Sequence, residues 1–325
     1  MNATKFKEGL LFAPIYWMLA FINLKAKLNV TSTWYDGNLA NSHTQLLAFN
    51  YTNNEQSRLF QFYMPELFRR LFGYSIEQAY LFNRWLFVFL AFWAFHLYLR
   101  KWFNTGWSAA GVFFLAAVMP ITYMNDLQES SALLMLVFLL ILWSVRAKNA
   151  WAFAGTMLLG ALTNETALVL GLAWVVNSLE DNRWTTWIKR SLLGLWYSTP
   201  AFVATAVIRY INRDRPHLGD PRQWYNNWGG IYRHLQLPPI EWLDAWYLYP
   251  FFIFGALWVY AWFGWKPSRD RMILAGLSVV PFFILPHMIT GIIFESRQMV
   301  PLAFVIIPAA WFWLHEKFPT AEDKG

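Results

Sequence analysis

The fold of this chain is decided by residues 151–179, WAFAGTMLLGALTNETALVLGLAWVVNSL, in which Glu165 is the single charged residue. As one helix this stretch would be about 43 Å long at ~1.5 Å per residue, which exceeds the ~30 Å hydrocarbon layer of a bilayer. One helix would also bury the Glu165 carboxylate at mid-depth, where a charge is costly. Two short helices that turn at residues 163–166 place this carboxylate at a membrane surface or in a wet pocket.

The distribution of Lys and Arg supports this turn. In membrane proteins these residues collect in short cytoplasmic loops. With the turn, the basic clusters after residue 179 fall on the same side as those before residue 151, whereas one long helix would separate them. The clusters are Arg100/Lys101, Arg146/Lys148, Lys189/Arg190 and Lys266/Arg269/Arg271. We therefore predict two short spans here, with the basic clusters in the cytoplasm.

The composition indicates an all-α polytopic membrane protein. Of the 325 residues 57% are hydrophobic and 14% are charged, well below the ~25% charged residues of soluble domains. The apolar runs are continuous rather than alternating, which argues against a barrel. The net charge of +7 follows from basic cytoplasmic loops, so no nucleic-acid partner is expected. Without cysteine the chain has neither disulfides nor thiol chemistry.

We predict about ten transmembrane helices in a single domain, residues 1–318, followed by a polar tail, residues 319–325. The first span is expected to be an uncleaved signal anchor, with both termini cytoplasmic and the protein in the plasma (inner) membrane. The two large outer loops are 28–78 and 212–245. The predicted spans are 9–24, 79–99, 106–123, 130–145, the two halves of 151–179, 191–211, 246–265, 272–291 and 299–315.

The first outer loop contains a helical pattern, RLFQFYMPELFRRLF at residues 58–72. Its large apolar residues alternate with Arg and Glu in the manner of a helix that lies in the membrane interface, apolar face down. A loop helix packed on the spans is the alternative. Pro65 is expected to kink the helix in either case.

The first polar break after the first apolar run is Thr33–Asn38, TWYDGN. Asp36 can act as a general base on a hydroxyl group within hydrogen-bond reach, and Gly37 permits a tight turn there. Trp34 and Tyr35 suit stacking on a sugar, although aromatic residues at a membrane surface more often belong to the interfacial belt. A solvated turn residue is the alternative role for Asp36.

Further acidic breaks fall on the same outer side as Asp36, and we expect them to surround one site. They are Asp126/Glu129, Glu165 and Glu295. Glu165 either serves in the site or belongs to a helix start, since Asn164 before it is a typical N-cap. Asp126 and Glu129 offer oxygen ligands that, together with Asp36, suit a divalent cation such as magnesium, calcium or manganese.

Arginine residues near the outer side are candidates for binding a phosphate group. Arg297 follows Glu295 by two residues, and its planar guanidinium matches phosphate oxygens. A local Glu295–Arg297 ion pair is the alternative. Arg84 and Arg58 are further phosphate candidates. In the second outer loop, Trp224 and Tyr225 suit stacking on an acceptor, and Glu295 is placed in the same acceptor or sugar site.

Three short motifs, in this order, resemble polytopic membrane proteins related to the C-type glycosyltransferase superfamily. They are Tyr35-Asp36-Gly37, Asn164-Glu165-Thr166 and Glu295-Ser296-Arg297. The resemblance implies a multi-span fold with a cavity on the non-cytoplasmic side, where such enzymes take sugar from a polyprenyl-phosphate carrier. It also implies that Asp36, at the matching position, is the base. Asn38-Leu39 stands where relatives often have Gln and an aromatic residue.

The leading hypothesis is a membrane glycosyltransferase with a polyprenyl-phosphate lipid as donor. Asp36 and Glu165 are the candidate catalytic residues, and Arg297, Arg84 and Arg58 the candidate ligands of the donor phosphate. A non-enzymatic subunit or assembly factor of a membrane complex is the alternative, in which these acids would not converge. A transporter ranks third, because the sequence shows no internal repeat.

Overall fold

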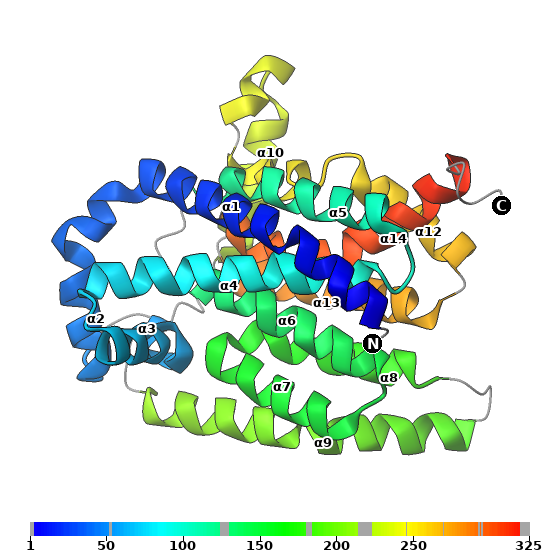
Figure 1. Cartoon of the computed structure of the whole chain (residues 1–325), viewed down its shortest axis with the longest axis horizontal. Coiled ribbons are helices and arrows are strands. Elements are labelled where there is room, and N and C mark those ends of the chain that lie inside the picture. Colours follow the sequence, from blue (N-terminus) through cyan, green and yellow to red (C-terminus); the bar gives the residue numbers. More distant parts are fainter. Residues whose placement is uncertain are drawn as a thin grey trace.

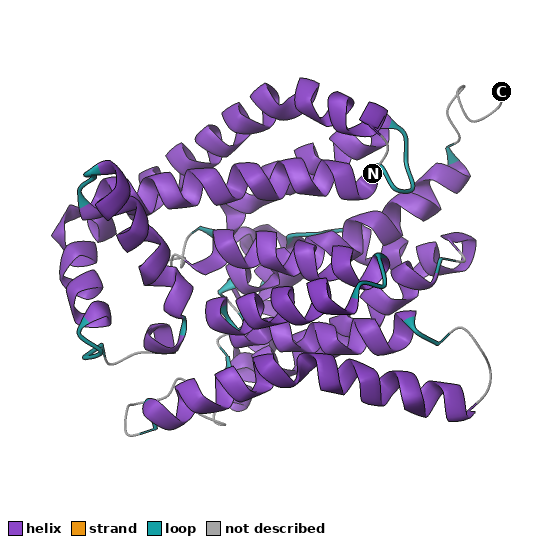
Figure 2. Cartoon of the chain, turned by 60° about the horizontal axis from the view of Figure 1, so that its bottom comes forward, coloured by secondary structure: helices purple, strands orange, loops and turns teal. Residues whose placement is uncertain are grey.

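The computed structural model describes residues 3–51, 54–123, 130–179, 184–213, 223–244, 246–268, 270–291, 293 and 295–318, together with the backbone but not the side chains of a few residues among them. These residues are helical apart from short connections, and no strand occurs among them (Figure 2). The predicted all-α class is confirmed at this level.

Six helices are long and apolar enough to cross a membrane, which indicates a polytopic integral membrane protein. They are α1 (Ala3–Thr33), α4 (Ile76–Leu99), α5 (Thr105–Val118) continued by η3 (Met119–Thr122), α9 (Trp184–Ile211), α13 (Arg271–Thr290), and η7 (Ser296–Leu302) continued by α14 (Ala303–Lys317). Shorter apolar helices are α6 (Ser130–Arg146), α7 (Ala150–Thr163), and η4 (Glu165–Leu170) continued by α8 (Gly171–Asn177).

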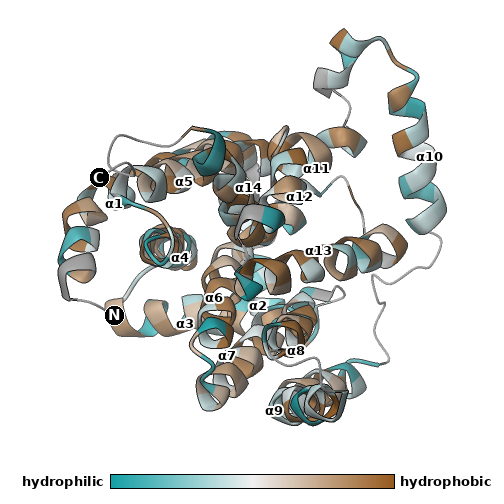
Figure 3. Cartoon of the chain, turned by 90° about the vertical axis from the view of Figure 1, so that its right-hand side faces the viewer, coloured by the Kyte–Doolittle hydropathy of each residue, from teal (hydrophilic) through white to brown (hydrophobic). Residues whose placement is uncertain are grey.

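The long helices lie side by side, and α6 and α14 form the centre of the bundle (Figures 1 and 3). Phe138 and Leu142 of α6 and Ile307 of α14 are fully buried. By contrast α1 and α9 expose most of their apolar side chains, as helices on the lipid-facing surface of a membrane protein do. The described part of the chain therefore has one large apolar core, beside a small separate cluster around Tyr35.

The predicted turn in residues 151–179 is confirmed as a helix break. α7 ends at Thr163, and Asn164 adopts an extended conformation with φ −164° and ψ 126°. The Asn164 side chain then accepts a hydrogen bond of 3.1 Å from the backbone N–H of Thr166 and caps η4. At Gly160 a Cβ would lie 2.7 Å from the Cβ of Ala167, so the missing side chain lets η4 fold back closely on α7.

The basic loops lie at one end of the bundle. Arg100 pairs with Glu8 at 2.7 Å, which ties the end of α4 to the start of α1. Arg146 pairs with Asp270 at 3.3 Å, which joins the end of α6 to the N-cap of α13. Lys148 and Arg190 line the same cavity of about 210 Å³. The basic loops, whose charges supported the predicted turn at residues 163–166, thus lie close to one another.

The helices differ clearly from the predicted spans at two places. α1 extends to Thr33 rather than ending near residue 24, and it places Lys27 fully inside the protein. Tertiary packing thus keeps a polar segment helical. The predicted span 246–265 is divided into η6 (Trp246–Leu248), α11 (Tyr249–Phe252) and α12 (Leu257–Ser268), with Gly255 between the last two at φ 48°. Glycine adopts this left-handed conformation readily, so the chain changes direction there.

The two large loops predicted for the outer side are helical in part. The first contains η1 (Trp34–Asn38), α2 (Leu39–Leu47), η2 (Asn54–Ser57) and α3 (Leu59–Phe72). α2 and α3 lie at the left-hand end of the bundle in Figure 1, where α4 begins. The second contains α10 (Gln223–Leu235) and η5 (Pro239–Asp244).

A close helix contact joins α12 to α14. A Cβ on Gly264 would overlap the backbone carbonyl of Ala309, and nearby Tyr260 stacks on Trp313 with ring centroids 4.6 Å apart. Small residues that let helix backbones approach in this way are typical of membrane helix packing. The absence of a side chain at Gly264 therefore holds α12 against the central helix.

We predict that Gly264→Ala lowers the thermal stability of the detergent-purified protein. The added methyl group meets backbone, which has no room to move, and overpacking of this kind costs about 1–3 kcal/mol. The matched control is Gly155→Ala in α7, where a Cβ meets nothing within 4 Å. Thermal unfolding of both variants checks this; equal melting temperatures would contradict the close contact.

Candidate functional site

Four of the residues predicted from the sequence come together at the end of the bundle opposite the basic loops. Arg58 immediately precedes α3, Glu165 begins η4, and Glu295 with Arg297 lies at the start of η7. The charges of Glu165, Glu295 and Arg297 all affect the pKa of Arg58. Residues separated by more than 200 positions in the sequence thus belong to one electrostatic cluster.

Glu165 is held by a bidentate ion pair with Arg209, near the end of α9. The Arg209 guanidinium donates to the two carboxylate oxygens at 2.7 and 3.0 Å. The Glu165 side chain is 35% exposed and that of Arg209 63%. Arg209 therefore neutralises Glu165, whose side chain remains partly accessible.

Glu295 and Arg297 form the local ion pair that the sequence analysis gave as the alternative to phosphate binding. Arg297 donates to Glu295 at 2.6 Å, and Gln298 donates to the same carboxylate oxygen at 2.8 Å. Arg297 is only 7% exposed. The pairing keeps this guanidinium charged in a buried position, so the ion pair and a role in anion binding are compatible.

Arg58 is the residue on which the cluster converges. Burial lowers its pKa, and the neighbouring positive charge of Arg297 lowers it further, against the opposing effect of Glu55, Glu165 and Glu295. Two guanidinium groups are thus held where they repel each other. A site that brings like charges together is stabilised by a ligand of the opposite charge, and two planar forks suit a phosphate group.

His287, in the last turn of α13, belongs to the same cluster and was missed from the sequence. Its side chain interacts electrostatically with Arg58, Glu165 and Glu295. Its Nδ1 lies 2.6 Å from the carbonyl oxygen of Phe283, and because a carbonyl only accepts, Nδ1 carries the proton. The lone pair of the neutral ring is then on Nε2. A His inside an apolar run without neighbouring polar residues carries no signal in the sequence.

Arg84 is connected to this cluster through one intervening element, η3. It is almost fully buried in α4, and its guanidinium stacks on the ring of Tyr123 at 5.2 Å. Tyr123 donates to Asn23 of α1 at 3.0 Å. η3, which ends directly before Tyr123, packs against η7, which carries Arg297. Arg84 thus approaches the site from the α1–α4 side.

The motif around Asp36 is only partly described. Its backbone forms the single π-helical turn η1, in which Gly37 adopts φ 94°, but the side chains of Trp34 and Asp36 lie outside the described residues. Tyr35 is buried in a small apolar cluster with Leu39 and Tyr80.

The remaining predicted residues are the acids Asp126 and Glu129 and the aromatic residues Trp224 and Tyr225. Asp126 and Glu129 lie outside the described residues. Among the described residues, no group of three His, Asp or Glu side chains is arranged to hold a metal ion. In α10, Trp224 packs against the core and contacts the edge of Trp228, whereas Tyr225 is 76% exposed.

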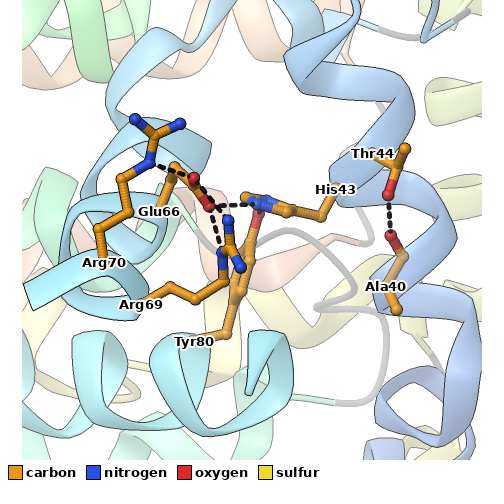
Figure 4. A network of polar contacts seen from close by, with 7 residues as sticks. All are labelled: Ala40, His43, Thr44, Glu66, Arg69, Arg70 and Tyr80. Carbon is orange, nitrogen blue, oxygen red and sulfur yellow. Dashed lines mark hydrogen bonds and ion pairs between the residues drawn. The ribbon is translucent and has the colours of Figure 1, made fainter. Parts of the chain in front are cut away.

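A second polar network lies beside the Tyr35 cluster (Figure 4). His43 of α2 contacts Glu66 of α3 at 3.2 Å through Nε2 and the hydroxyl of Tyr80 at 3.0 Å through Nδ1. Because a carboxylate only accepts, Nε2 carries the proton and Nδ1 accepts from Tyr80. Burial lowers the pKa of His43, so the ring is neutral near pH 7. The network therefore ties α2, α3 and α4 together and sets the position of Tyr80 against Tyr35.

Glu66 also accepts three hydrogen bonds from neighbouring arginines. Arg69 donates at 2.6 and 2.9 Å and Arg70 at 2.6 Å. The bonds from Arg69 are the main reason that the pKa of Glu66 falls to about 2. Glu66 is thus ionised at any physiological pH, although it is almost fully buried.

No protein-family model matches this chain, and comparison with curated proteins and with solved structures finds no match either. The site is therefore assigned on its own geometry.

We predict that Glu66 makes folding stability depend on acid pH. The folded pKa of about 2 lies below the ordinary value of 4.5, so ionised Glu66 stabilises the fold above pH 4.5, and this contribution is lost as the pH falls toward 2. Denaturant unfolding of the wild type and of Glu66→Gln at several pH values checks this. The difference in the free energy of unfolding between the wild type and Glu66→Gln should narrow as the pH falls from 4.5 toward 2. A difference that stays constant would contradict the pairing of Glu66 with the arginines. Glu77→Gln, at the exposed start of α4, is the control.

Proposed function

We propose that the protein is a membrane glycosyltransferase that takes sugar from a polyprenyl-phosphate carrier on the non-cytoplasmic side. In this proposal the chain crosses the plasma membrane about ten times, with both termini and the basic loops in the cytoplasm. Segment 249–268 makes one crossing as a broken helix, and α3 lies in the outer interface. In Figure 1 the start of α1 and the end of α14 lie toward the same end of the bundle. This arrangement supports an even number of membrane crossings.

The observation that carries the proposal is the electrostatic cluster in which the positive charge of Arg297 acts on Arg58, together with Glu165 and Glu295. A lipid phosphate at the end of the spans would lie at the level of this cluster. Its negative charge would offset the repulsion between the two guanidinium groups, and the same contacts would stabilise the phosphate as it leaves the sugar. Arg84, which borders the site through η3, adds a third positive charge.

The reaction needs little more than positioning and a base. Asp36 takes the proton from an acceptor hydroxyl, whose oxygen forms a bond to the anomeric carbon of the sugar. The bond between this carbon and the phosphate oxygen breaks, and the polyprenyl phosphate departs with the electron pair, held by Arg58 and Arg297. Glu165, fixed by Arg209, accepts a hydrogen bond from the acceptor and orients it.

Replacement of the proposed base should abolish most of the activity. Asp36→Asn keeps the size of the side chain but cannot accept the proton, so transfer from a polyprenyl-phosphate sugar should fall about 100- to 10,000-fold. Release of the lipid phosphate in proteoliposomes measures this. The matched control is Glu241→Gln, an exposed acid in the second outer loop. Unchanged transfer by Asp36→Asn would exclude this base.

Replacement of the proposed phosphate ligands should weaken donor binding. Arg297→Lys and Arg58→Lys keep the charge but lose the planar fork, and a lost charge-assisted hydrogen bond costs about 1.5–3 kcal/mol, or roughly 10- to 150-fold in affinity. Binding of sugar-free polyprenyl phosphate measures this separately from catalysis. Arg233→Lys, on exposed α10, should bind as the wild type does. Equal affinities for all three variants would place the phosphate elsewhere.

A further inference from the structure

α10 is a helix whose sides face three different environments. Asn227, Gly230 and Ile231 on one side are buried against the protein. A second side carries large apolar residues that touch little: Tyr225 is 76% exposed, Trp228 49%, Tyr232 65% and Leu235 53%. At 3.6 residues per turn these four fall in one stripe along the helix, which we call the aromatic stripe. The exposed polar residues Asn226 and Arg233 lie on the remaining side.

The buried side of α10 is attached to the end of a span. The Asn227 side-chain amide donates to the carbonyl oxygens of Met288 at 2.9 Å and Gly291 at 2.8 Å, and its oxygen accepts from the N–H of Ile293 at 3.1 Å. Gly230 leaves room for the ring of Tyr247, which lies where a Cβ would otherwise be. These contacts hold the helix at the end of α13 that bears the candidate site.

The direction of α10 differs from that of the spans. In Figure 1 it points away from the bundle while α4 and α9 run along it, and in Figure 3, where α4 and α9 are viewed end-on, α10 is seen from the side. A helix that runs across the spans at their end lies parallel to the membrane surface. Because the protein covers one side of such a helix, one of its two remaining sides faces lipid and the other faces water.

We propose that α10 lies in the lipid headgroup layer at the Arg58–Arg297 end of the bundle, with the aromatic stripe buried in the bilayer. Tyr and Trp are the residues that membrane interfaces favour, because the ring is apolar and the hydroxyl or N–H stays hydrated. The opposite flank, with Asn226 and Arg233, faces water. The partner is a lipid surface, and the assignment does not depend on the reaction proposed above.

Single-cysteine variants test this, because the chain has no cysteine of its own and a thiol label attaches only at the introduced site. Tyr225→Cys and Tyr232→Cys report on the aromatic stripe; Asn226→Cys and Arg233→Cys are the matched controls on the polar flank. Each variant is spin-labelled in phosphatidylcholine vesicles, and collisions with oxygen, which concentrates in lipid, are compared with collisions with a water-soluble nickel chelate.

The expected result is a several-fold higher ratio of oxygen to nickel collisions at the two stripe positions than at the two controls. Equal exposure of all four labels to the nickel chelate would overturn the proposal, since the stripe would then face water. Shielding of the stripe labels from both reagents would also overturn it and would indicate a protein partner or a second copy of this chain. All four positions are exposed, so each variant should keep the wild-type melting temperature.

Discussion

A charge inside this bundle requires an opposite charge or a polar partner, because an isolated ion in an apolar medium is strongly unfavourable. Glu165 shows the consequence for the fold. The chain breaks its helix at Asn164 so that the carboxylate reaches the end of the bundle, where Arg209 from α9 neutralises it. That break divides one overlong apolar stretch into two short helices and brings the basic loops that follow to the same end as those before it.

The same constraint explains why the candidate site is compact. Glu295 neutralises Arg297, and Glu55 with Glu165 counteracts the repulsion that Arg58 experiences from Arg297. Pairing of this kind keeps the buried guanidinium groups charged without spreading them apart. For the phosphate proposed as its ligand, the cluster is therefore already assembled, which lowers the cost of ordering it at the moment of binding.

The sequence predicts those parts of the fold and site that depend on charge and length alone. The turn at Asn164 follows from an overlong apolar run with one acid. Counting spans assigns Arg58, Glu165 and Arg297 to one side of the membrane, but the site that Glu165 is expected to share with Asp36, Asp126 and Glu129 stays a prediction, because those three side chains lie outside the described residues. The extension of α1 and the break at Gly255 depend on tertiary packing, which no local pattern encodes. His287 was missed for a similar reason, since only the carbonyl of Phe283 and the surrounding charges distinguish it from other residues of its apolar run.

The end of α13 links the site to α10. A helix leaves its last carbonyl groups without partners, and here the amide of Asn227 takes up those of Met288 and Gly291. Only a few residues separate these carbonyls from Arg297. The Asn227 side chain, which binds the end of α13, therefore also limits how far the Glu295–Arg297 turn can move. If α10 lies in the headgroup layer as proposed, its depth sets that of Arg297, because one buried amide connects this helix to the charged cluster.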